Sequence, residues 1–155
     1  MKTLILGMGN PILTNDGVGL SVAEMLRGKI PQADVASSTM IGLYLFDLII
    51  GYDALFIVDA MTTRDSRIGK MKKISKHGRQ GTLHLFSSHG LNIFELMDLG
   101  VHCGLKMPRL AAVYGIEIGD EVAFGYTLSP ALNKKLPVIT EEIIADITCV
   151  LPSLS

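Results

Sequence analysis

Short apolar runs alternate along this chain with segments in which apolar residues recur at helical spacing. The runs predict buried strands and the spaced segments predict helices. The continuous run ALFIV, residues 54–58, is typical of a central parallel strand covered on both faces, and we expect it to stop at Asp59. Residues 70–74 contain three lysines, as an edge strand often does. The predicted strands cover residues 2–8, 34–37, 54–58, 70–74, 83–86 and 110–116.

The predicted helices cover residues 18–28, 43–51, 91–100 and 129–147. Ser87 or Ser88 is placed to cap the third helix, and Gly100 to end it. Pro137 should kink the last helix or divide it in two. Strands that alternate with helices predict a three-layer α/β/α sandwich, with a central twisted, mainly parallel sheet of about five strands.

Length and composition narrow the class of protein. With 155 residues the chain can bury one sizeable core, so we expect a single domain over residues 1–155. The 14 Lys and Arg residues against 15 Asp and Glu residues lack the basic excess of a nucleic-acid binder. The mean hydropathy is high, +0.40, but the most apolar stretch, residues 43–58, contains Asp47 and Asp53 and predicts no membrane span.

The N-terminal apolar run is too short for the core of a signal peptide, so we expect a cytoplasmic protein, and a monomer. Cys103 and Cys149 fit no metal-ligand or redox spacing, which predicts two reduced and mostly buried thiols. A metal site at His102 and Cys103 stays open, although adjacent side chains in an extended segment point apart.

Three polar residues stand just past an apolar strand or run: Asp16, Asp59 and His89. The carboxyl ends of parallel strands share one edge of a sheet, so these side chains can converge. Two carboxylates and an imidazole suit a divalent transition metal that keeps open positions for water or substrate. Each residue also has a simpler interpretation. Asp16 could cap the helix that follows it, Asp59 could start a turn, and His89 could be a polar residue in a first helical turn.

Other catalytic patterns are missing from the sequence. There is no GxSxG elbow for a nucleophilic serine. The pair Gly7 and Gly9 would need a third glycine at position 12 to bind a dinucleotide, and that residue is Ile12.

The segment GMGNPILTNDGVG, residues 7–19, resembles the GxGNxxxxDDGxG or GxGNxxxxDEGxG opening of the hydrogenase maturation endopeptidases. That family removes the C-terminal extension from the large subunit of nickel–iron hydrogenases. The resemblance continues through IVDAM around Asp59, SSHG at His89 and GYTLSPAL at residues 125–132, and it covers nearly the whole chain. Asn15 departs from the pattern, since the family usually has an acid there, and Ser37-Ser38-Thr39 stands where Gly-Gly-Thr is common.

The resemblance implies that Asp16, Asp59 and His89 bind nickel. It also implies that the nickel is the ion already inserted into the hydrogenase large-subunit precursor, so that cleavage follows metallation. A water polarised by nickel, with Asp16 or Asp59 as the base, is a chemically reasonable way to break the peptide bond.

Two alternatives remain open. The opening at residues 7–11 is also similar to the GxGNPG of peptidyl-tRNA hydrolases. That family, however, has a His and an Asn in a TRHN-like context, where this chain has Thr14, Asn15 and Asp16. The other alternative is a non-catalytic maturation module that binds nickel through the same three residues.

Overall fold

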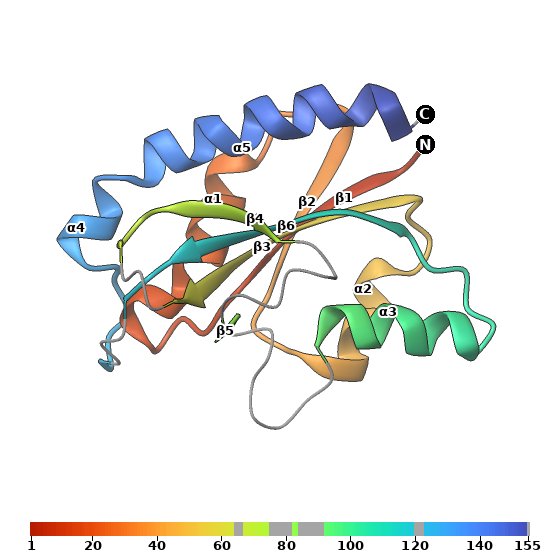
Figure 1. Cartoon of the computed structure of the whole chain (residues 1–155), viewed down its shortest axis with the longest axis horizontal. Coiled ribbons are helices and arrows are strands. Elements are labelled where there is room, and N and C mark those ends of the chain that lie inside the picture. The colour runs from red at the N-terminus through yellow and green to blue at the C-terminus, as the bar shows by residue number, and fades with distance from the viewer. Residues whose placement is uncertain (64–66, 75–81, 84–91, 120–122, 155) are drawn as a thin grey trace.

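The structure is a computed structural model that describes residues 1–63, 67–74, 82–83, 92–119 and 123–154. A twisted sheet runs through its centre, with strand order β2-β1-β3-β6-β4 (Figure 1). Strands β2, β1, β3 and β6 pair in parallel, and β4 pairs antiparallel to β6 at the edge of the sheet. A short strand, β5, pairs antiparallel with the end of β3. The strands are β1 (Thr3–Met8), β2 (Ala33–Ser38), β3 (Ala54–Thr62), β4 (Met71–Ile74), β5 (Thr82–Leu83) and β6 (Arg109–Glu117).

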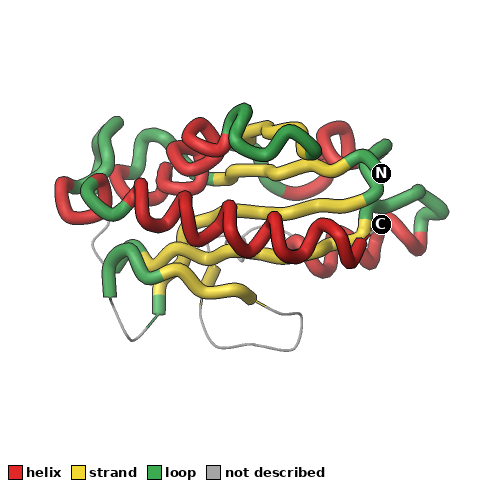
Figure 2. Tube along the Cα trace, turned by 90° about the horizontal axis from the view of Figure 1, so that it is seen from above, coloured by secondary structure: helices red, strands yellow, loops and turns green. Residues whose placement is uncertain are grey.

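Helices cover both faces of this sheet (Figures 1 and 2). On one face α1 (Val18–Leu26) and α5 (Leu136–Val150) bury residues such as Val22 and Ile143 against Phe56. On the other face α2 (Phe46–Ile49) and α3 (Ile93–His102) bury residues such as Ile49 and Leu96 against Ile57. The predicted three-layer α/β/α sandwich is therefore confirmed.

Shorter helical elements complete the described chain. They are η1 (Thr14–Gly17), η2 (Gly42–Leu45), α4 (Pro130–Asn133) and η4 (Leu151–Leu154). The division between α4 and α5 falls just before Pro137, as predicted, because a proline fits the first turn of a helix but not its interior. No helix in the described ranges is long and apolar enough to cross a membrane.

Two boundaries differ from those predicted. The third strand does not stop at Asp59 but continues to Thr62, because β6 pairs with it as far as Met61. The cap of α3 is Asn92, whose side chain accepts a hydrogen bond from the Glu95 amide while the Glu95 carboxylate accepts one from the Asn92 amide. Ser87 and Ser88, the predicted caps, lie outside the described residues.

The end of α3 also differs from the prediction. The helix passes Gly100, a buried residue packed against Met107, and ends at His102. His102 lies in the last turn of the helix, and Nδ1 of its ring lies 2.7 Å from the carbonyl oxygen of Asp98. The prediction of mostly buried thiols is wrong, since Cys103 and Cys149 are both exposed. Of the predicted strand at residues 83–86, only Leu83 is described.

Candidate functional site

Asp16 lies in η1, the turn between β1 and α1, and its side chain is 6% exposed. Its Oδ2 accepts a hydrogen bond from the Asn10 amide at 3.2 Å, and its own amide donates to the Leu13 carbonyl at 2.7 Å. Asp16 is not the cap of α1, because the cap position belongs to Gly17, which has no side chain. The simpler interpretation of Asp16 as a helix cap is therefore wrong.

Two glycines hold the Asp16 turn tightly against the sheet. A Cβ atom on Gly9 would lie 2.2 Å from the Asp16 carbonyl oxygen. A Cβ atom on Gly19 would lie 2.1 Å from the carbonyl oxygen of Met8 and 2.5 Å from that of Val58. Because no other residue leaves room for such close approach, the glycine pattern of this loop serves packing of α1 onto β1 and β3.

Asp59 lies inside β3 with 2% exposure and pairs with Gly115 of β6. Side chains alternate along a strand, so Asp59 shares a sheet face with Ile57 and Met61, which pack on the side of α2 and α3. This position inside a strand rules out the interpretation of Asp59 as the start of a turn.

Asp16 lies in the turn after β1 and Asp59 lies in the neighbouring strand β3, at a point where the topology reverses. From β1 the chain crosses through α1 to β2 on one side, and β3 pairs with β1 on the other side. Open α/β sheets bind ligands at such a switch point, beyond the carboxyl ends of the strands. The structure thus brings Asp16 and Asp59 to the same end of the sheet, as their sequence positions predicted. The two termini lie near each other at the other end (Figures 1 and 2).

His89, the third predicted residue, lies outside the described residues, so the predicted trio stays a prediction. The described segment after it begins with Asn92 and α3, on the sheet face that Asp59 shares. Among the residues that the structure does describe, no group of three His, Cys, Asp or Glu side chains could hold a metal ion.

Glu117 is a further buried carboxylate at this end of the sheet, and the sequence analysis missed it. It is 1% exposed, and its carboxylate accepts hydrogen bonds from the Thr63 amide at 3.1 Å, the Thr63 hydroxyl at 2.5 Å and the Gly119 amide at 3.3 Å. These bonds join the ends of β3 and β6. The signal was present, because Glu117 follows an apolar strand as Asp59 does.

Asn15 ties the Asp16 turn to two distant parts of the chain. Its Oδ1 accepts a hydrogen bond from the Ser129 amide at 2.8 Å, and its Nδ2 donates to the Ile118 carbonyl at 3.4 Å. Asn15 is buried, and its amide side chain accepts one bond and donates the other, which an ionised carboxylate cannot do. This gives a physical reason for an amide where the maturation endopeptidases usually have an acid.

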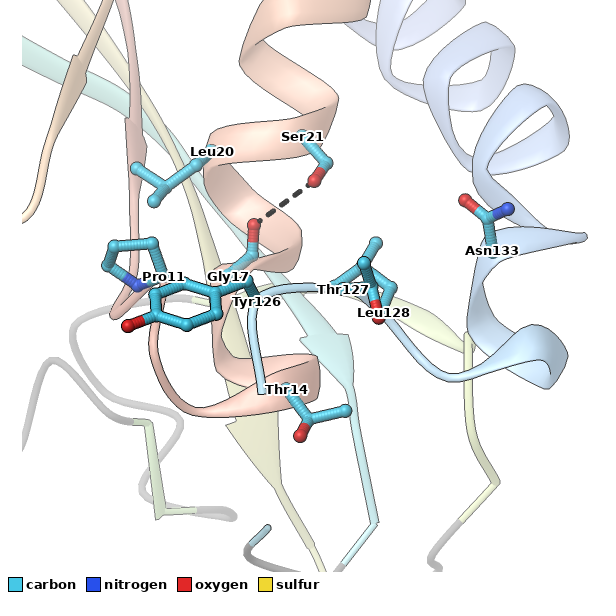
Figure 3. Close-up of a pocket in the computed structure, with 9 residues that line it drawn as sticks. All are labelled: Pro11, Thr14, Gly17, Leu20, Ser21, Tyr126, Thr127, Leu128 and Asn133. Carbon is cyan, nitrogen blue, oxygen red and sulfur yellow. Dashed lines mark hydrogen bonds between the residues drawn. The ribbon is translucent and has the colours of Figure 1, made fainter. Parts of the chain in front are cut away.

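The segment 123–129 is hydrogen-bonded to the loop at residues 12–15 that contains Asn15. The Gly125 amide donates to the Ile12 carbonyl at 3.0 Å, and the Thr14 hydroxyl donates to the Ala123 carbonyl at 2.8 Å. Between this segment, η1 and the first turns of α1 lies a pocket of about 330 Å³ (Figure 3). Its walls include Thr14 and Gly17, which flank Asn15 and Asp16 in the chain.

Known hydrogenase maturation endopeptidases share this fold of a mainly parallel sheet covered by helices on both faces. Over 149 residues the chain is 22% identical to the hydrogenase 2 maturation protease of Escherichia coli, a match that covers 94% of this chain and 90% of that protein. No protein-family model matches the chain.

Solved structures of similar fold carry the same family name. The hydrogenase maturating endopeptidase HybD of Escherichia coli matches with a TM-score of 0.75 and 19% identity, over 96% of this chain and 93% of that chain. The [NiFe] hydrogenase maturation protease HycI of Thermococcus kodakarensis matches with a TM-score of 0.68 and 20% identity, over 93% and 90% of the two chains. The family resemblance seen in the sequence motifs is confirmed by these relatives.

Proposed function

We propose that this chain is an endopeptidase that removes the C-terminal extension of a nickel–iron hydrogenase large-subunit precursor after nickel has been inserted. The observation that carries the proposal is the pair of buried carboxylates, Asp16 and Asp59, at the switch point of the sheet. The similarity of the chain to hydrogenase maturation proteases supports it.

The nickel is part of the substrate in this proposal, and Asp16, Asp59 and His89 recognise it. Buried carboxylates lose their hydration, so a cation placed beside them is strongly favoured. Carboxylates and an imidazole together form a donor set that suits a divalent ion such as nickel, since imidazole is a good nickel ligand. Recognition through the metal makes the enzyme act only on precursor that already carries it.

Hydrolysis requires a water molecule to attack the carbonyl carbon of the cleaved bond and a proton to reach the departing nitrogen. The carboxylate of Asp16 or Asp59 accepts the proton of that water and passes it to the nitrogen as the C–N bond breaks. A divalent cation brought by the substrate supplies polarisation of the attacking water.

Exposed apolar side chains around this end of the sheet support a protein as the substrate. Large hydrophobic side chains are exposed just after β2 and in the loops beside η1, and exposed apolar patches of this kind mark protein interaction sites. The side chains concerned are Ile12, Met40, Ile41, Leu43, Tyr44, Phe124 and Tyr126.

The test measures the mass of a candidate precursor before and after incubation with the purified chain. We expect nickel-loaded precursor to lose its C-terminal extension with the wild-type protein, and to stay intact with Asp59→Asn or His89→Ala. Asp47→Asn, which changes an exposed carboxylate on α2, should trim as the wild type does. Equal trimming by Asp59→Asn and wild type would contradict the proposed site. Nickel binding by calorimetry without any trimming would favour the non-catalytic module.

A further inference from the structure

We propose that the pocket beside η1 holds one uncharged side chain of the precursor, from a residue within a few positions of the cleaved bond. The proposal rests on the proposed function and adds to it the part of the substrate that this pocket selects. Four observations carry it: the position of the pocket, its size, the chemistry of its lining and the way its walls are fixed.

The first observation is the position of the pocket beside Asp16. Thr14 and Gly17 form part of the pocket wall and lie directly on either side of Asn15 and Asp16 in the chain. An extended polypeptide advances only about 3.3–3.6 Å per residue. A peptide bond held at Asp16 therefore has a residue within a few positions of it that passes the mouth of the pocket.

The size fits a side chain. A volume of about 330 Å³ is at the lower end of the range for small-molecule sites, which is about 300–1,000 Å³. The pocket has room for one side chain with some adjoining backbone, and too little for a dinucleotide or similar cofactor.

The residues that line the pocket favour an uncharged side chain. None of the nine lining residues is charged. Apolar surface comes from residues such as Leu20 and Leu128, and the polar groups are uncharged, as in Thr127 and Asn133. A charged side chain entering here would lose hydration without gaining an opposite charge, which is costly.

The walls are fixed before any substrate arrives. The bonds that join residues 123–129 to residues 12–15 hold the two sides of the pocket in one arrangement. Inside the pocket the Ser21 hydroxyl donates to the Gly17 carbonyl at 3.4 Å. Tyr126, which is 86% exposed, also lines the pocket, and its ring lies on the same side of the view as Pro11 in Figure 3. A fixed pocket binds its occupant at a lower cost in conformational entropy.

The experiment fills the pocket with Ser21→Leu and uses nickel-loaded precursors in which each residue flanking the cleaved bond is changed to alanine in turn. On the native precursor we expect kcat/KM to fall by about tenfold or more, the effect of a few misplaced methylene groups in a binding pocket. On one alanine precursor, the one whose residue enters the pocket, Ser21→Leu should cleave as well as the wild type does.

Ser153→Leu is the matched control. The Ser153 hydroxyl also donates to a helical carbonyl, that of Val150, and Ser153 is exposed on η4, outside the pocket. Thr127→Leu provides a second filled pocket if Ser21→Leu lowers the melting temperature.

An unchanged kcat/KM in both filled variants, an equal loss on every precursor, or a loss matched by Ser153→Leu would overturn the pocket proposal while leaving the proposed function standing. Absence of trimming by the wild-type protein would instead contradict the proposed function, and this proposal with it.

Discussion

Asn15 connects the candidate site to parts of the chain that are more than 100 residues away. Its hydrogen-bond partners, Ile118 and Ser129, are 103 and 114 positions further along. Because of this separation, the sequence alone shows Asn15 only as a departure from the pattern of the maturation endopeptidases. The structure supplies the reason for the amide, which is that it must accept one bond and donate the other.

Replacing Asn15 by the acid that the family usually carries should therefore harm this protein. Asn15→Asp removes the donor to the Ile118 carbonyl and buries a charge beside that oxygen. We expect a loss of about 1–3 kcal/mol in the free energy of unfolding, measured by urea denaturation. Asn133→Asp, at an exposed amide of α4, should change stability little. An Asn15→Asp variant as stable as the wild type would show that the amide is not needed.

Some of the buried carboxylates at the site could be predicted from the sequence, and one was missed. Asp16 and Asp59 could be predicted, because an acid after an apolar strand has a defined place in a parallel sheet. Glu117 meets the same criterion, because it directly follows the predicted strand at residues 110–116, but it was not among the predicted site residues. Its bonds to Thr63 and Gly119 depend on how β3 and β6 pair, which the sequence does not reveal.

Among the elements, β6, β4 and α5 are joined by a partly buried polar contact. Tyr114 of β6 is fully buried and stacks on Phe56, with the ring centroids 6.4 Å apart. Its hydroxyl donates to Asp146 Oδ2 at 2.6 Å, and Lys73 Nζ lies 2.7 Å from the same oxygen. Burial, together with the adjacent Asp146 carboxylate, raises the pKa of Tyr114.

The pKa of Asp146 shifts the other way. Partial burial acts to raise it, but the hydrogen bonds from Lys73 and Tyr114 and the charge of Lys73 outweigh that effect and lower the pKa. A carboxyl whose pKa is lower in the folded state than in the unfolded state, where it is about 3.9, stabilises the fold above that pH. The stabilisation is lost as the pH falls through the folded-state pKa.

We therefore expect Asp146→Asn to lower the free energy of unfolding at neutral pH, with the difference from wild type shrinking below about pH 4. Urea denaturation at a series of pH values measures the free energy of unfolding of the variant and of the wild type. The exposed Asp47→Asn should follow the wild-type curve at every pH. A deficit of Asp146→Asn that stays constant from neutral to acid pH would contradict the assigned role of the carboxylate.

Elements with strong local patterns were predictable, and those set by distant partners were not. The charged strand at residues 70–74 is confirmed as the edge strand β4, since lysines tolerate the open side of a sheet. The length of β3 was underestimated, because its last residues are held by pairing with β6 and β5 and not by their own hydrophobicity.

For the molecule as a whole, alternation of strands and helices was enough to predict the layered fold. The order of the strands was not predictable in the same way, since it depends on which side of β1 each crossover packs. That order determines the site. Because β1 and β3 are neighbours with β2 on the far side, the turn after β1 lies beside the end of β3, and Asp16 and Asp59 lie at the same end of the sheet.

Under the proposed function, this protein cleaves its substrate only when the substrate carries nickel. The most direct measurement is the mass of a hydrogenase large-subunit precursor after incubation with the wild-type chain, in parallel for nickel-loaded and nickel-free precursor. We predict loss of the C-terminal extension from the nickel-loaded precursor and an unchanged mass for the nickel-free one. Equal cleavage of both, or cleavage of neither, would contradict the account.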